Sequence, residues 1–185
     1  MRLASIWPEE NSSSVDFANI FSAAPTDFHP ANAQILYFTK QYDLAYRHAL
    51  YDADVKHPVP HGILYVAVPH HIMQDATPIF GADFQQLVWD SRRDNPRQEI
   101  AESVRHYTQA PLLVGPVCGD STEEIRRRCR QPGDIEHPVL ESGELAQQYA
   151  WQGLPVADRL SCDCEVLIWL QEMHCRGWGR WRSRP

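Results

Sequence analysis

The sequence predicts an α+β domain built from many short elements. Residues 35–39, Ile-Leu-Tyr-Phe-Thr, are β-branched or aromatic and suit a buried strand. The pattern then changes, because Leu44 and His48, like Ala45 and Ala49, fall on one face of a helix. A core strand therefore leads directly into a short amphipathic helix. Fourteen prolines and nine glycines interrupt the chain too often for a bundle of long helices.

The length and composition fit one globular domain. With 185 residues, of which 43% are hydrophobic, the chain can bury a substantial core. A formal net charge of −7 argues against nucleic acid as the main partner. No apolar run approaches the ~18 residues of a membrane span, and the N-terminus lacks the apolar core of a signal peptide. Five irregularly spaced cysteines do not predict a disulfide framework, so we expect a cytoplasmic, reduced protein.

The segment before the central strand carries little regular pattern. Apolar residues near the N-terminus predict the end of a first strand: Leu3, Ile6 and Trp7. A second apolar group predicts one helical turn: Phe17, Ile20 and Phe21. A loop bounded by Pro25 and Pro30 then leads into the strand at residues 35–39.

After the helix over residues 41–51, residues 52–61 read as a loop with two prolines. Residues 63–68, Ile-Leu-Tyr-Val-Ala-Val, predict a second strand, and their near-continuous apolar character suggests cover on both faces. Residues 83–93 place apolar side chains on one helical face behind Asp83, a residue type that often caps a helix.

The second half of the chain holds one short strand and two helical regions. Residues 112–114 predict the strand. Ser121 and Glu124 match a capping box, so a helix begins there, and the arginine run at residues 126–130 is its solvated face. A last helical region covers roughly residues 141–170 and is interrupted near Gly153 and Pro155. We therefore expect one domain over residues 1–170 and a basic, tryptophan-containing tail over residues 171–185.

General motifs do not reveal a site. The histidines and cysteines lack the spacings of common metal sites, so no metal is predicted. The glycines of residues 114–120 do not form a phosphate loop, because the lysine and the glycine spacing of that motif are missing.

The order of several short motifs nevertheless resembles a known family. The chain is similar to the small ADP-ribosyltransferase-like proteins of the DUF3990 type, which share the fold of ADP-ribosylating toxins and poly(ADP-ribose) polymerases. The likeness spans about residues 20–160. Its pieces are Asp27-Phe28, Tyr37-Phe38-Thr39, residues 45–49, 63–69 and 84–88, Arg92-Arg93, residues 114–117, and residues 147–160 as a closing helix.

The resemblance implies a split β-sandwich of ADP-ribosyltransferase type with flanking helices and a cleft for NAD, which would serve as substrate. In such a cleft a basic residue holds the dinucleotide, an aromatic residue packs on the nicotinamide, and a carboxylate binds the ribose. Breaking the glycosidic bond places positive charge on the ribose, so a fixed carboxylate stabilises the transition state.

Carried over residue by residue, the resemblance places Tyr37 at the aromatic position, with Thr39 just beyond it, and Arg2 at the dinucleotide contact. At the acidic position the chain offers Asp83 and Gln86. Asp83 supplies charge if it faces the cleft, but it can also serve as a helix cap. Gln86 can hydrogen-bond a ribose but carries no charge. The ring of Tyr37 can equally be core filler.

Three functions stay open on this reading. The first is an NAD-binding ADP-ribosyltransferase that modifies an unknown protein or small-molecule acceptor. The second is an interaction module that keeps the fold and has lost catalysis. The third and weakest is a nucleic-acid-associated protein that uses the arginines at residues 126–130 and the tail.

Overall fold

The computed structural model describes residues 17–22, 25–31, 34–56, 62–93 and 99–170. Its elements, in chain order, are η2 (Phe17–Ile20), β1 (Ile35–Phe38), α1 (Tyr42–Lys56), β2 (Gly62–Ala67), α2 (His70–Met73), β3 (Ala76–Pro78), α3 (Gly81–Arg92), α4 (Glu102–Arg105), η3 (His106–Gln109), β4 (Leu112–Pro116), α5 (Thr122–Arg128), η4 (Pro132–Asp134), β5 (Gln147–Gln152), α6 (Leu154–Asp163) and β6 (Glu165–Leu170). In this part of the chain no helix is both long and apolar enough to cross a membrane.

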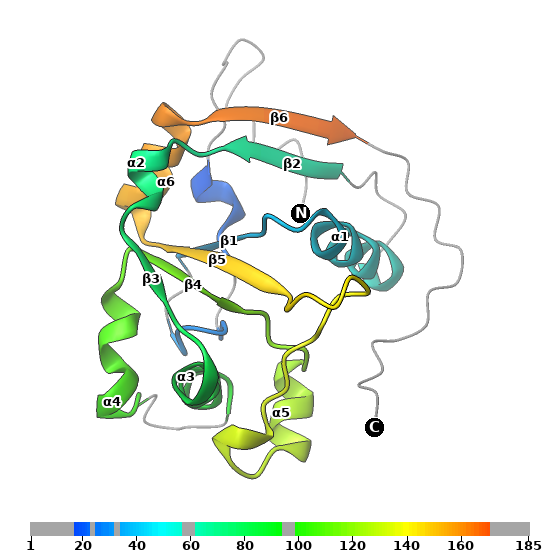
Figure 1. Cartoon of the computed structure of the whole chain (residues 1–185), viewed down its shortest axis with the longest axis vertical. Coiled ribbons are helices and arrows are strands. Elements are labelled where there is room, and N and C mark those ends of the chain that lie inside the picture. The colour runs from blue at the N-terminus through cyan, green and yellow to red at the C-terminus, as the bar shows by residue number, and fades with distance from the viewer. Residues whose placement is uncertain (1–16, 23–24, 32–33, 57–61, 94–98, 171–185) are drawn as a thin grey trace.

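Two sheets form the β part of this mixed α and β fold. The larger sheet has the strand order β1-β5-β4-β3, in which only the β3–β4 pair is parallel. The smaller sheet is the antiparallel pair of β2 and β6. In Figure 1 the pair β2–β6 lies above the larger sheet, and α3, α4 and α5 lie below it. The larger sheet is thus the middle layer.

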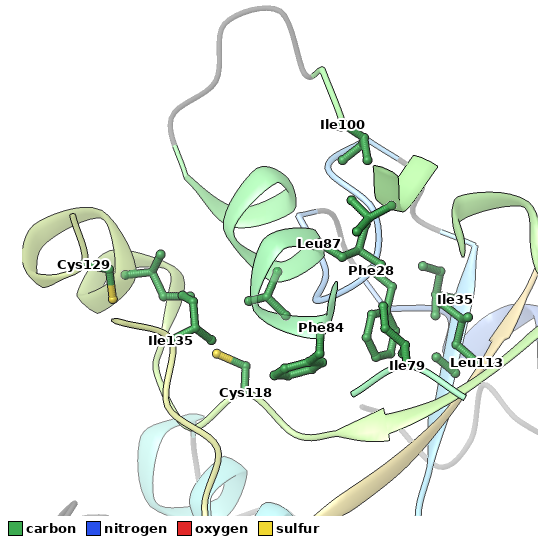
Figure 2. Packing of buried hydrophobic residues seen from close by; sticks show 14 residues of the cluster. Phe28, Ile35, Ile79, Phe84, Leu87, Ile100, Leu113, Cys118, Cys129 and Ile135 are labelled. Atoms are coloured by element: carbon green, nitrogen blue, oxygen red, sulfur yellow. The ribbon is translucent and has the colours of Figure 1, made fainter. Parts of the chain in front are cut away.

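The middle sheet separates two apolar clusters. On its lower face, Phe28, Ile35, Leu113 and Ala150 pack with residues of α3, including Phe84. Figure 2 shows this packing around the ring of Phe84. Because alternate residues of a strand point to opposite faces, their chain neighbours form the second cluster on the upper face: Leu36, Leu112 and Trp151. The sheet is therefore covered on both sides.

Several elements follow the sequence prediction. The strands predicted at residues 35–39, 63–68 and 112–114 are β1, β2 and β4, and the helix predicted at residues 83–93 is α3. At the start of α5, the Ser121 hydroxyl accepts a hydrogen bond from the Glu124 amide, and the Glu124 carboxylate accepts one from the Ser121 amide. This confirms the predicted capping box. The arginines that follow it are exposed, as expected for a solvated helix face.

Three local expectations are wrong. The helical region predicted over residues 141–170, with an interruption near Gly153 and Pro155, is the unit β5–α6–β6, in which only α6 is helical. Residues 52–56, expected to belong to a loop, are part of α1, which continues to Lys56. The strand β2 is not covered on both faces, since Tyr65 is 44% exposed while Leu64 and Val66 pack on the upper cluster. The apolar run of β2 therefore reflects only one buried face.

Candidate functional site

A buried ion pair joins the loop before β1 to the end of α3. Arg92 Nη2 lies 2.5 Å from Asp27 Oδ1, and the Asp27 side chain is only 5% exposed. This contact is an attraction between charges, since no hydrogen bond is aligned with Asp27 Oδ1. A charge is costly to remove from water, so a pair in this position needs further partners or a specific role.

Polar groups from two more elements converge on this pair. Gln148 on β5 donates from Nε2 to Asp27 Oδ2 over 2.7 Å and to the carbonyl oxygen of Pro116 over 2.9 Å. The backbone amide of Cys118, in the loop after β4, lies 3.5 Å from Asp27 Oδ2. We call Asp27, Tyr37, Arg92, Cys118, Asp120 and Gln148 the polar cluster.

The sheet explains why these residues meet. Tyr37 of β1 pairs with Ala150 of β5, so Tyr37, Ala150 and Gln148 share the lower face of the sheet. The α3 helix covers that face and ends at Arg92. The turn formed by Thr26 and His29, with three mutual hydrogen bonds of 3.0 to 3.1 Å, holds Asp27 and Phe28 against it. The polar cluster therefore lies at the edge of the lower apolar core.

Tyr37 contributes a ring and a hydroxyl to the cluster. The ring is half-buried and lies 6.0 Å from the ring of Phe28, measured between centroids. The hydroxyl is enclosed and makes no hydrogen bond of good geometry. Burial, and next the negative charge of Asp27, raise the pKa of Tyr37, so its phenol stays protonated.

Arg92 makes one aligned hydrogen bond, from Nη1 to the carbonyl oxygen of Asp120 over 2.9 Å. Its Nε is buried without a partner. Burial is the largest single influence and lowers the pKa of the guanidinium, but Asp27, followed by Cys118, Tyr37 and Asp120, together outweigh it, so the pKa is raised. Arg92 is therefore a permanent cation with part of its hydrogen-bonding capacity unused.

The Cys118 thiol belongs to the same environment. Burial, and next the charge of Asp27, raise its pKa to about 12. The neighbouring Arg92 opposes this shift only in part. A thiol in this state is a poor nucleophile, because thiolate is the reactive form.

In the described part of the chain, buried polar atoms without a hydrogen bond gather in the polar cluster, although one of them, Asp27 Oδ1, takes part in the ion pair with Arg92. Among the described residues, six buried side-chain oxygen or nitrogen atoms make no hydrogen bond, and four of them belong to the cluster: Asp27 Oδ1, Tyr37 Oη, Arg92 Nε and Asp120 Oδ2. Buried polar atoms are normally paired, so such a concentration calls for an explanation in terms of bound water, a ligand or function. The cluster is accordingly the candidate functional site.

The residues predicted for the ribose lie at a different part of α3. Asp83 is exposed in the first turn and accepts a hydrogen bond from the Tyr107 hydroxyl over 3.1 Å. Burial, and next this bond to Asp83, raise the pKa of Tyr107. Asp83 and Arg92 are near opposite ends of the helix, about 13 Å apart along its axis at 1.5 Å per residue. The structure therefore does not join Asp83 to the polar cluster.

Gln86 has a structural partner of its own. Its Nε2 donates to Asp90 Oδ1 over 2.9 Å, and Asp90 Oδ2 accepts the backbone amide of Ala101, also over 2.9 Å. Asp90 thereby clasps the end of α3 to the start of α4. Gln86 supports this clasp.

The two remaining predicted residues have different outcomes. Thr39 Oγ1 accepts the backbone amide of Gln41 over 3.0 Å, a contact that orders the chain just before α1. Arg2, and the first strand expected around Leu3 and Trp7, lie outside the described residues, as does the tail over residues 171–185.

Sequence reasoning did not assign a site role to Asp27, Arg92 or Gln148, although all three stand in segments that carry the family resemblance. Asp27 and Gln148 are acidic and amide residues in apolar surroundings, which is a weak signal of a buried polar contact. Their meeting depends on strand pairing between distant segments, which no local pattern shows.

A hollow on the upper side of the sheet has a volume of about 10 Å³, which is the room of one water molecule, and it is lined by Ile72, Asp75, Pro111, Leu112, Trp151, Val156 and Arg159. Within the described ranges, no three His, Cys, Asp or Glu side chains gather in a way that could hold a metal ion.

Comparison with protein-family models, curated proteins and solved structures gives no match to this chain.

Proposed function

We propose that this protein binds NAD, or a ligand that resembles ADP-ribose, in a domain of ADP-ribosyltransferase type, with the site at Tyr37 and the polar cluster. The family resemblance supplies the ligand class. The paired arrangement of a four-stranded and a two-stranded sheet with flanking helices is compatible with the split β-sandwich that the resemblance implies.

The observation that carries this proposal is the position of Tyr37. Its half-buried ring offers an aromatic surface of the kind on which nicotinamide stacks. Its hydroxyl makes no hydrogen bond of good geometry, and the charged side chains of Asp27 and Arg92 both act on it. An aromatic ring next to a carboxylate and a guanidinium is a combination that suits a ligand with a flat ring, ribose hydroxyls and phosphates.

Transfer of ADP-ribose requires, beyond binding, residues that assist bond cleavage at the ribose. The bond between the ribose C1′ and the nicotinamide nitrogen breaks, the electron pair leaves with nicotinamide, and the acceptor forms the new bond to C1′ and loses a proton. Asp83 and Gln86, the residues that the resemblance offers at the ribose, lie at a different part of α3 from the polar cluster. Because Asp83 is paired with Tyr107 and Gln86 with Asp90, ligand binding is better supported than turnover.

These same pairings favour a second candidate function. An interaction module that keeps the fold without transferase activity needs no free carboxylate at the ribose. It also fits a Tyr37 that serves mainly as packing for Phe28. The two candidates differ in whether NAD binds at all.

A thermal-shift titration with NAD and ADP-ribose, followed by chromatography for released nicotinamide, tests the proposal. A ligand that binds only the folded state raises the melting temperature by mass action. A shift with nicotinamide release supports the transferase, and a shift without release supports a binding protein. The absence of any shift at millimolar NAD would leave the interaction module as the better account.

A pair of variants on one strand localises the site. Tyr37→Leu removes the ring on the lower face of β1, whereas Phe38→Leu removes a half-buried ring on the opposite face. We expect the NAD-induced shift to disappear in the first variant and to persist in the second. Equal loss in both variants would contradict the assignment of the site to Tyr37.

A further inference from the structure

The guanidinium of Arg92 is only partly used in the ligand-free protein. Its Nη1 donates to the Asp120 carbonyl oxygen, its Nη2 faces Asp27 without an aligned hydrogen bond, and its Nε has no partner. Through the edge formed by Nε and Nη2, arginine can donate two parallel hydrogen bonds to two oxygens of a carboxylate or phosphate. In Arg92 this edge meets a single carboxylate oxygen.

Asp27, in contrast, has partners that do not depend on Arg92. Its Oδ2 receives the Gln148 amide at 2.7 Å, with the Cys118 backbone amide at 3.5 Å. If the Arg92 side chain turns toward a ligand, the Asp27 carboxylate keeps these donors. Phe28, whose ring is fully buried beside it, can stay in place.

We propose that Arg92 is the phosphate-binding residue of this site and that Asp27 holds it in place until the ligand arrives. This inference rests on the proposed NAD or ADP-ribose site. The phosphates of the ligand take the Nε and Nη2 edge and replace the contact with Asp27 Oδ1. The Arg92 side chain is 19% exposed, so part of it is accessible from solvent.

Neighbouring arginines are less suited to this role. Arg93 lies over the ring of Trp89, 5.4 Å from its centroid. Arg128 is 47% exposed and pairs with Asp120 Oδ1 over 2.6 Å. Neither combines a buried, unpartnered Nε with proximity to Tyr37, which is the combination that distinguishes Arg92.

The first test measures affinity for ADP-ribose and for adenosine by calorimetry, in the full-length chain and its variants. Arg92→Lys keeps the charge and loses the two-pronged edge, so we expect the affinity for ADP-ribose to fall about 10-fold or more, while that for adenosine, which has no phosphate, is unchanged. Arg93→Lys is the matched control and should bind both compounds as the wild type does. Wild-type affinity for ADP-ribose in a folded Arg92→Lys variant would overturn the inference.

The second test uses the opposite partner. Asp27→Asn preserves the size of the side chain but removes the charge that holds Arg92, so the affinity for ADP-ribose should rise several-fold. A fall in affinity in a folded Asp27→Asn protein contradicts the role of Asp27 as a competitor of the phosphates.

A third measurement needs no variant. The Nε–H resonance of Arg92 in the wild-type protein should shift on addition of ADP-ribose and stay in place with adenosine. An unshifted signal in a protein saturated with ADP-ribose rules Arg92 out as the phosphate ligand. If ADP-ribose and NAD do not bind the wild type at all, the proposed function fails, whereas binding that ignores Arg92 removes this inference alone.

Discussion

Gln148 Nε2 donates a hydrogen bond of 2.7 Å to Asp27 Oδ2 and so connects β5 to the loop that precedes β1, its neighbour in the larger sheet. The same amide donates to the Pro116 carbonyl oxygen. The neutral side chain of Gln148 thus links β5, the end of β4 and the loop that contains Asp27, and it provides a hydrogen bond to the buried Asp27 carboxylate. A variant without this side chain measures how much these hydrogen bonds contribute to stability.

Gln148→Leu should destabilise the protein. The variant leaves Asp27 Oδ2 with only the long contact to the Cys118 amide, and hydrogen bonds to charged groups contribute about 1.5–3 kcal/mol to stability. Urea unfolding measures the loss. Gln147→Leu is the control. Gln147 is next to Gln148 in the chain, its side chain is half-buried, and its backbone amide, which the variant keeps, donates a hydrogen bond to Gln41 Oε1. Similar losses in both variants would show that the Asp27 contact has no special weight.

Tyr37→Phe should leave stability unchanged or raise it slightly. The hydroxyl that it deletes is enclosed and makes no hydrogen bond of good geometry, so only weak contacts with Thr26 and the Phe28 backbone are lost. Thermal unfolding compares it with Tyr107→Phe, which deletes the bond to Asp83 and should cost about 0.5–1.5 kcal/mol. A larger cost at position 37 than at position 107 would reveal a partner of the Tyr37 hydroxyl, such as bound water.

Gly115→Ala should disrupt the parallel pair of β3 and β4. A Cβ at Gly115 would lie 2.5 Å from the carbonyl oxygen of Ile79 and 2.9 Å from its Cγ2, so the strand end must shift, at a cost of about 1–3 kcal/mol. Gly133→Ala is the control, since nothing lies within 4 Å of its Cβ position. Chemical denaturation of both variants checks the contrast, and a stable Gly115→Ala protein would mean that Ile79 gives way easily.

The raised pKa of Cys118 predicts slow alkylation and a loss of stability in alkali. In the folded protein the thiol titrates at about 12, against an ordinary value of 9.0. The folded state therefore holds the proton longer than the unfolded state, and stability falls as the pH rises from 9.0 toward 12. Mass spectrometry after iodoacetamide treatment at pH 8 should find the exposed Cys162 labelled well before Cys118. Equal labelling would contradict the burial of the Cys118 thiol.

Ser121→Ala should loosen α5. The Ser121 hydroxyl accepts the Glu124 amide at 3.2 Å, and loss of such a cap costs about 1 kcal/mol. The backbone and side-chain bonds from Ser121 also lower the pKa of Glu124, so the stability that they contribute is present above the ordinary value of 4.5 and is lost as the pH falls through the lowered value. Hydrogen exchange in α5 reports the change, with the exposed Ser103→Ala as control. Unchanged exchange in α5 after Ser121→Ala would argue against the cap.

Local chemistry made part of this fold predictable. The β-branched and aromatic run of β1 and the capping box of α5 act through neighbouring residues, so their patterns are visible in sequence. The order of β5, α6 and β6 was not visible, because Gln147–Gln152 mixes buried amides with buried rings and so lacks the alternation of a one-sided strand. A strand in the middle layer is buried on both faces.

The candidate site was less predictable than the fold. Tyr37 is a candidate from the sequence, because it lies in a core strand and the family resemblance places it at the aromatic position. Asp27, Arg92 and Gln148 come together only when a loop, the end of a helix and a central strand meet in the folded chain. Burial and pairing over long sequence distances are properties of the folded chain. A pattern within ten residues cannot contain them.

The clasp that Asp90 makes with the Ala101 amide has a consequence for the connection between α3 and α4. It fixes the two points from which that connection departs, independently of the residues in between. Lengthening a loop whose ends are already held together adds only a slowly growing entropic cost, about 0.6 kcal/mol for each doubling of length. We therefore expect a peptide label inserted between the two held points to cost little stability as long as Asp90 is preserved.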